Sequence, residues 1–155
     1  MDLIPDTGEI ALRLALAIVL GGALGVEREI RGKVAGLKTH MMVALGSATF
    51  TLVALEIHAQ LVIDDPSVTR VDPLRLLEGI IGGIGFLGAG SIIRSGGSVE
   101  GLTTAGSLWF TGAIGVSVGG GHYVIAGLAV GMGLVVLIGV RVLERRIRGL
   151  PDHPG

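Results

Sequence analysis

The chain has 155 residues, of which 50% are hydrophobic and only 16% are charged, and its formal net charge is −1. Soluble domains carry about 25% charged residues, so this composition argues against a water-soluble globule. The near-zero charge and scarce aromatic residues argue against a nucleic-acid partner, and the lack of cysteine excludes disulfides and thiolate chemistry. We therefore expect an all-α membrane protein whose main contact is the lipid bilayer.

Five apolar segments follow one another along the chain, each close to the 17–25 residues that cross about 30 Å of hydrocarbon. Their expected ranges are 10–26, 39–63, 74–93, 102–118 and 123–143. The fourth segment is rich in small residues, so a short or re-entrant helix is an alternative there. The pattern predicts a bundle of about five transmembrane helices in a single domain, 1–148, followed by a short cytoplasmic tail, 149–155.

Basic residues are unevenly divided between the two sides of this bundle. One side has only Arg13, Arg70 and Arg75, whereas the other nine lie in the links and tail of the opposite side. Because basic loops stay in the cytoplasm, we expect the N-terminus outside and the C-terminus in the cytoplasm. The predicted location is the inner (plasma) membrane, with several passes.

Glycine makes up 28 of the 155 residues, and the stretch 79–90 is especially rich in it. In lipid the backbone must be helical to satisfy its own hydrogen bonds, and the missing side chains allow close helix contacts. We interpret this stretch as a membrane helix packed on several sides, with Trp109 as a further packing residue in the core. The packing glycines are Gly79, Gly82, Gly83, Gly85, Gly88 and Gly90. GxxxG spacing at Gly21/Gly25, Gly115/Gly119 and Gly127/Gly131 predicts further close contacts.

Residues 83–88 also read GxGxxG, the pattern of dinucleotide-binding loops. That motif requires a preceding strand and an acidic residue about 20 positions later. Here the upstream residues are apolar and glycine-rich, and the only nearby acidic residue downstream is Glu100. We therefore predict helix packing here, with no nucleotide and no other cofactor.

Ionisable residues at the outer side form one candidate site. Glu78, Glu56 and His58 fall at similar depth, and Arg13 could pair with Glu78 or Glu56. Charges in the bilayer normally pair or face a cavity, so a cation or proton pocket is one reading, and a structural ion pair is the other. Asp64, Asp65 and Asp72 could gather Mg²⁺ in the outer loop, or could simply be solvated.

The cytoplasmic side carries a second cluster of polar residues. Thr39 and Thr103–Thr104 open two of the expected helices, where threonine commonly caps free N–H groups. Such a helix start beside Arg28 and Arg94 could also hold an anion, or the arginines could serve topology and lipid headgroups. The full cluster is Glu27, Arg28, Glu29, Thr39, His40, Arg94, Thr103 and Thr104. An intramembrane hydrolase built on Ser107 and His122 is not expected, because the helix plan places them at opposite sides.

Two runs in these regions resemble the MgtC/SapB family of membrane proteins. The first is 25–29 with 35–40, and the second is 83–90 with Arg94, 101–105 and 108–109. The resemblance covers about residues 10–140. It implies an inner-membrane protein linked to magnesium homeostasis, with no enzymatic activity, and some members act by binding other membrane complexes. Many members also carry a soluble C-terminal domain, which we do not expect here, and Lys38 stands where arginine is common.

Two functions remain open at this point. The chain could modulate another membrane protein complex through small-residue helix faces. Alternatively, it could transport a cation or small solute through a pocket between the helices, with Glu78 as the central group and a homodimer as the expected assembly.

Overall fold

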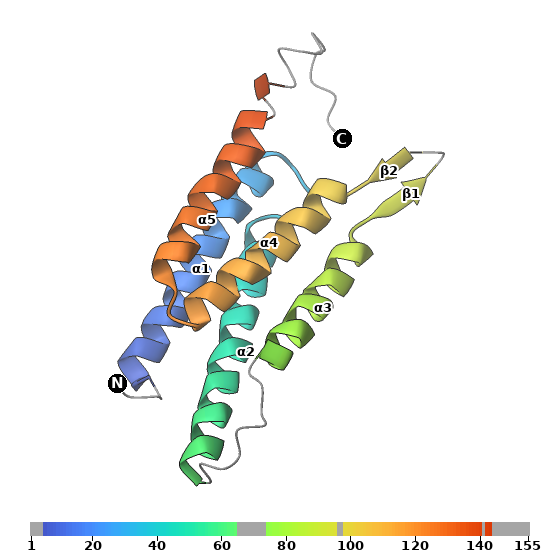
Figure 1. The fold of residues 1–155 in the computed structure, drawn as a ribbon. Coiled ribbons are helices and arrows are strands. Elements are labelled where there is room, and N and C mark those ends of the chain that lie inside the picture. The colour runs from blue at the N-terminus through green and yellow to red at the C-terminus, as the bar shows by residue number, and fades with distance from the viewer. Residues whose placement is uncertain (1–4, 65–73, 96–97, 141, 144–155) are drawn as a thin grey trace.

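The computed structural model describes residues 5–64, 74–95, 98–140 and 142–143 (Figure 1). In chain order its elements are α1 (Thr7–Ile30), α2 (Leu37–Asp64), α3 (Leu74–Gly90), β1 (Ile93–Ser95), β2 (Ser98–Glu100), α4 (Leu102–Gly119), α5 (Tyr123–Val135) and the π-helical η1 (Val136–Val140). The all-α architecture with five helices is confirmed.

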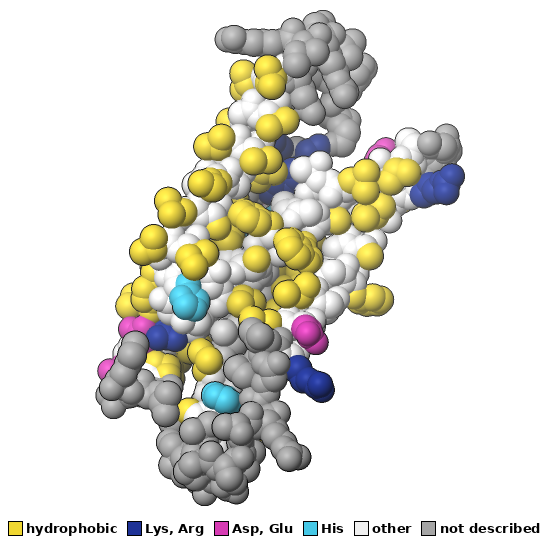
Figure 2. Space-filling view, viewed as in Figure 1, with side chains coloured by type: hydrophobic (Ala, Val, Ile, Leu, Met, Phe, Trp, Pro, Cys, Tyr) yellow, Lys and Arg dark blue, Asp and Glu magenta, His cyan; other side chains and the backbone are white. Residues whose placement is uncertain are grey.

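Three of these helices are long and apolar enough, by length and composition, to cross a membrane. They are Thr7–Ile30, Leu37–Leu61 and the α5–η1 segment Tyr123–Val140. Apolar side chains cover the middle of the visible face, and charged side chains gather toward its ends (Figure 2). This distribution is that of a membrane protein.

The third helix ends three residues earlier than predicted, at Gly90. The expected polar turn after it is a small antiparallel hairpin, in which Ile93 pairs with Glu100 and Arg94 with Val99. Gly101 closes the hairpin with φ +87°, and a side chain at that position would collide with the Ser91 carbonyl. A left-handed residue next to a backbone carbonyl therefore requires glycine here.

Helix α4 lies at the centre of the bundle and contacts the other four helices (Figure 1). The buried apolar core joins it to α1, α2 and α5, with Leu24, Ile114 and Val118 as its largest members. The fourth segment, for which a short or re-entrant helix was an alternative, is an 18-residue helix that the other four helices contact.

Glycines bring α1, α2 and α4 into backbone contact. A Cβ on Gly21 would lie 2.8 Å from the His40 carbonyl oxygen, and one on Gly25 would lie 2.8 Å from the Leu37 Cα. A Cβ on Gly119 would lie 2.7 Å from the Ala48 carbonyl oxygen. Two of the three predicted GxxxG pairs therefore make close helix contacts, as expected for lipid-embedded helices.

Other predicted packing positions face open space. A Cβ on Gly127 or Gly131 would meet no atom within 4 Å, so the third GxxxG pair makes no close contact within the described chain. On α3 only Gly88 has a neighbour, with Ala105 O 3.3 Å from an added Cβ. The open glycines of α3 are Gly79, Gly82, Gly83, Gly85 and Gly90. Trp109 is 49% exposed, so its predicted position in the core is wrong.

Candidate functional site

A layer of buried polar side chains lies where α1 ends and where α2 and α4 begin. We call this end of the bundle the basic end, because Arg28, Arg31, Lys33, Lys38 and Arg94 all belong to it. The buried polar residues of the layer are Glu27, Arg28, His40, Thr104, Ser107 and Thr111. Buried polar groups are costly unless they are hydrogen-bonded, so their partners indicate what the layer does.

His40 is 0% exposed and joins α2 to α4. Its Nδ1 lies 2.8 Å from the Gly36 carbonyl oxygen, and its Nε2 lies 3.2 Å from the Ser107 hydroxyl. A carbonyl oxygen only accepts, so Nδ1 carries the proton, and in a neutral ring Nε2 then accepts from Ser107. The Ser107 hydroxyl also lies 2.9 Å from the Thr104 carbonyl oxygen, so its single proton serves one acceptor at a time.

Arg28 is the second connection between helices and is only 3% exposed. Its Nη2 donates to the Thr104 hydroxyl of α4 over 2.8 Å, while its Nε finds no partner in the described chain. The neighbouring Glu27 is ion-paired through Oε1 to Arg31, and its Oε2 is also without a described partner. The Glu27 carboxylate therefore serves two arginines: it is ion-paired with Arg31 and also acts electrostatically on Arg28, whose described hydrogen-bond partner is the Thr104 hydroxyl.

The rest of the predicted cytoplasmic cluster is divided between the surface and the α1–α2 link. The Glu29 carboxylate accepts a 2.8 Å hydrogen bond from the Leu37 amide and so covers the start of α2. Thr39, Thr103 and Arg94 are exposed. The expected threonine caps are wrong, because α2 begins at Leu37 and α4 has Gly101 as its N-cap, without a side-chain cap bond.

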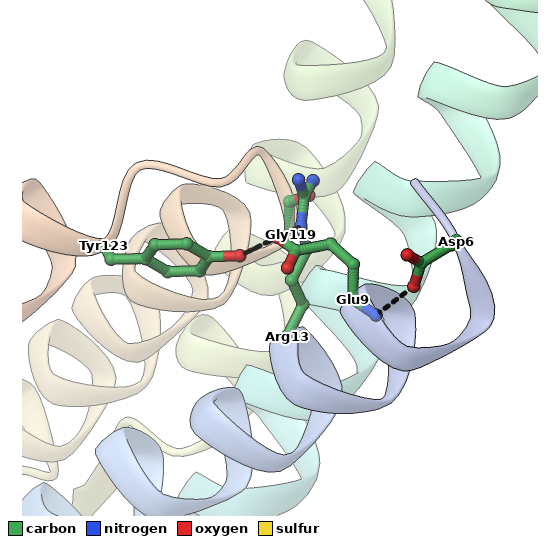
Figure 3. A network of polar contacts seen from close by, with 5 residues as sticks. All are labelled: Asp6, Glu9, Arg13, Gly119 and Tyr123. Atoms are coloured by element: carbon green, nitrogen blue, oxygen red, sulfur yellow. Dashed lines mark hydrogen bonds and ion pairs between the residues drawn. The ribbon is translucent and has the colours of Figure 1, made fainter. Parts of the chain in front are cut away.

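At the opposite end, Arg13 connects α1 to the turn from α4 to α5 (Figure 3), and we call this connection the Arg13 clasp. Its Nε donates to the Glu9 carboxylate over 2.9 Å, and its Nη1 donates to the Gly119 carbonyl oxygen over 2.8 Å. The Tyr123 hydroxyl donates to the same Glu9 oxygen. The predicted pairing of Arg13 with Glu78 or Glu56 is therefore wrong, because a carboxylate four residues earlier on the same helix is within reach.

The predicted outer acidic residues are not brought together. Glu56 and Glu78 are exposed, and His58 is half-buried with Nδ1 lacking a partner among the described groups. Across the described part of the chain, no three His, Asp or Glu side chains are grouped as a metal site would require. Asp65 and Asp72 lie outside the described residues, and the side chain of Asp64 is not described.

Two of the cavities between the helices are apolar and are lined by residues that the structure describes. The larger, about 580 Å³, lies between α2 and α3 and reaches from Thr39 to Phe50 and from Gly79 to Leu87. The smaller, about 370 Å³, lies between α1, α4 and α5 near the basic end, and Ser107 and Thr103 are its hydroxyl-bearing residues. The walls of both cavities are almost entirely apolar, so each cavity suits a hydrocarbon group rather than a hydrated ion.

Sequence reasoning missed Ser107, Thr111 and Tyr123 as parts of these networks. Thr104, Ser107 and Thr111 recur at spacings of three and four, which places them on one helix face, and this signal was available in the sequence. Ser107 bonds to His40 and not to His122, which is exposed in the turn that follows α4. The partner of Tyr123 lies 114 residues away and left no local signal.

Comparisons with known proteins identify one matching family and several relatives. The model of the MgtC family matches residues 14–146. YhiD of Escherichia coli K12, which carries a provisional name as a magnesium transporter, is 40% identical over 84% of this chain and 60% of its own length. Protein MgtC of Brucella abortus is 43% identical over 85% of this chain and 50% of its own, and Protein SapB of Bacillus subtilis is 36% identical over 94% and 61%. The chain thus spans about half to three fifths of these relatives, and no solved structure matches it.

Proposed function

Because the chain belongs to the MgtC family of membrane proteins, we propose that it serves magnesium homeostasis by binding another membrane protein complex, rather than by carrying ions itself. The name of YhiD supports the link to magnesium. We further propose a multi-pass inner-membrane protein with the basic end in the cytoplasm, since basic residues stay on that side.

The observation that carries the proposal is the contrast between the closed centre of the bundle and the open surface of α3. Between α1, α2 and α4, glycines hold the backbones in contact at Gly21, Gly25, Gly115 and Gly119. The buried charged side chains and His40 are confined to the basic end. Beyond that layer the described core is apolar except for Ser47 and Thr51, whose hydroxyls donate to carbonyl oxygens of their own helix. A hydrated cation would meet hydrocarbon there, at a high desolvation cost.

By contrast, α3 presents an open face to its surroundings. Gly82, Gly85, Phe86 and Ala89 are all exposed and recur at spacings of three and four, so they share one side of the helix. A helix side with small residues and one large aromatic allows a second helix to approach closely. We propose this open α3 face as the surface that contacts the partner complex. A second copy of the chain is a partner of the same chemistry, so the homodimer stays a prediction.

The test compares two substitutions on α3 in a strain that depends on this protein for growth at limiting magnesium. Gly82→Leu fills the open face and is expected to abolish growth, whereas Glu78→Gln is expected to leave it intact. Gly131→Leu on α5, another open glycine, controls for a bulky side chain facing lipid. Each variant must first be present in the membrane fraction at the normal level.

The transport alternative predicts the reverse pattern. Loss of growth in Glu78→Gln with Gly82→Leu unaffected, together with cation flux in liposomes containing the purified chain, would overturn the regulatory proposal. Growth of both variants would also contradict it, because the open α3 face would then be dispensable.

A further inference from the structure

The cavity between α1, α4 and α5 has a lining that the proposed function does not use. Its volume is about 370 Å³, and its apolar wall includes Leu24 of α1, Phe110 of α4 and Met132 of α5. Met132 is exposed, as are Val135 and Val136 beside it, so the cavity is continuous with the apolar outer surface of α5. An occupant can therefore enter from the hydrocarbon of the bilayer.

The local backbone explains why a space exists at this place. Helix α5 changes to π-helical geometry at Val136, and Val136 and Leu137 line the cavity. Such π segments are uncommon and are frequent at functional sites. One turn earlier, Gly133 leaves room for the Phe110 ring, which would lie 2.5 Å from a Cβ there. The Phe110 ring thus packs against α5 at Gly133, and the cavity lies beside this contact, next to the π-helical turn.

The mouth of the cavity carries an uncapped helix N-terminus. Thr103, in the first turn of α4, lines the cavity, and the N-cap Gly101 supplies no side-chain acceptor to the free N–H groups of that turn. The amide dipoles of an 18-residue helix place partial positive charge at this point. Anions are bound favourably at such positions.

A second, independent observation is the buried charge of Arg28, which does not line the cavity but is bonded to Thr104, the neighbour of the cavity residue Thr103. Its guanidinium is held against the first turn of α4 by the Thr104 hydroxyl, and Arg28 follows the cavity residue Leu24 by one helical turn. The described residues place no ion-pair partner on Arg28, and its Nε has no hydrogen-bond partner there. The one nearby carboxylate, that of Glu27, is shared between Arg28 and Arg31, so this buried group keeps one positive charge in excess. An anion beside the α4 N-terminus would offset that charge.

We propose that this cavity binds an anionic phospholipid from the leaflet at the basic end. One acyl chain fills the space between α4 and α5, and the phosphate accepts hydrogen bonds from the first turn of α4 and the Thr103 hydroxyl. Arg28 attracts the phosphate from behind Thr104. The apolar wall of the cavity favours a lipid over a free anion, because inorganic phosphate has no apolar surface to bury against this lining.

This site differs from ordinary attraction of lipids to surface lysines. Arg28 is buried and fixed, whereas Lys38 is exposed at the same end of the bundle. A fixed charge near an apolar cavity selects both parts of the lipid, the headgroup and the acyl chain. The inference is independent of the open α3 face, which lies on another helix.

The experiment reads the occupancy of the cavity with a single tryptophan. The reporter chain carries Trp109→Phe and Met132→Trp, so its one indole faces the cavity, and the native chain, with Trp109 outside it, is the comparison. Each is reconstituted in phosphatidylcholine vesicles with increasing brominated phosphatidylglycerol or brominated phosphatidylcholine. We expect the cavity reporter to be quenched about fivefold more effectively by the anionic lipid, the effect of one nearby basic residue, and Trp109 to show no such preference.

Two substitutions in the reporter chain, each with a matched control, test the mouth of the cavity. Arg28→Gln is expected to remove the anionic preference, and Lys38→Gln, with the same loss of charge, to keep it. Thr103→Asp places a carboxylate at an exposed position of the α4 N-terminus, which favours the helix but repels the phosphate, so it also removes the preference. Thr39→Asp adds the same charge to the first turns of α2 and is expected to change nothing.

Four results overturn the proposal. They are equal quenching of the cavity reporter by both lipids, an equal preference at Trp109, a preference that survives Thr103→Asp, and loss of the preference when sodium chloride is replaced by inorganic phosphate at equal ionic strength. The last result would assign the site to a free anion. If Arg28→Gln fails to fold, Thr103→Asp and Thr39→Asp decide the outcome.

Discussion

His40 shows how a single residue can connect two helices in a core that is otherwise made of glycine and small apolar residues. It has no exposed surface, and both ring nitrogens are engaged, one by Gly36 and one by Ser107. The Gly36 bond fixes the tautomer, so the ring presents an acceptor to α4. The Ser107 hydroxyl is the donor that matches it.

Removal of that donor gives a prediction at the residue scale. Ser107→Ala leaves the buried Nε2 of His40 without a partner, and we expect a loss of about 1–3 kcal/mol in the free energy of unfolding. Ser117→Ala is the matched control, because its hydroxyl donates only to the Ala113 carbonyl oxygen of its own helix. Thermal unfolding in detergent measures both. Equal midpoints for the two variants would contradict the assigned role of His40.

Arg13 gives a second prediction at this scale. Its bonds to Glu9, Gly119 and Tyr123 hold the turn between α4 and α5 against α1. Gly121 in that turn has φ +77°, and a Cβ there would lie 3.1 Å from the Arg13 guanidinium, so the two residues fit together. We expect Arg13→Ala to increase amide hydrogen exchange in residues 119–123, whereas Arg75→Ala, which removes an exposed arginine of α3, leaves it unchanged. Unaltered exchange in Arg13→Ala would show that the clasp does not hold the turn.

At the scale of the helices, backbone contact distinguishes glycines that appear alike in the sequence. A Cβ on Gly115 would meet the Ala44 carbonyl oxygen and lie 2.7 Å from the Ser47 Cβ, whereas one on Gly127 would meet nothing within 4 Å. Gly115→Ala must therefore push α4 away from α2, at a cost of about 1–3 kcal/mol. Gly127→Ala should leave the thermal midpoint in detergent unchanged or slightly raised. A larger loss in Gly127→Ala would indicate that α5 has a close partner outside the chain.

Particular helices show how far the sequence predicts this fold. The apolar lengths predicted five helices because lipid imposes helical hydrogen bonding on any apolar span. They did not predict which glycines touch a neighbour, since GxxxG spacing at Gly21/Gly25 and at Gly127/Gly131 is the same in sequence and differs only in what packs opposite. The Arg13 clasp and the His40–Ser107 bond were missed for a related reason, because each depends on a helix crossing and not on local spacing.

At the scale of the whole molecule, orientation is the feature that topology experiments can test directly. The chain contains no cysteine, so single cysteines can be introduced without a background signal. Val34 in the α1–α2 link and His122 in the α4–α5 turn are both exposed and lie at opposite ends of the bundle. A thiol reagent that cannot cross the membrane should label His122→Cys from outside intact cells, and Val34→Cys only after permeabilisation. Labelling of both from outside would contradict the spanning arrangement itself.

The central place of α4 has a consequence for biogenesis. Within the part of the chain that the structure describes, α4 is not among the three helices apolar enough to enter a bilayer by composition alone, and it carries Thr104, Ser107 and Thr111 on one face. The α1–α2 pair precedes it in synthesis and presents Arg28 and His40 to exactly that face. We therefore expect the α1–α2 hairpin to enter the membrane before α4 is stably integrated, because the hairpin supplies the hydrogen-bond partners of the polar α4 face.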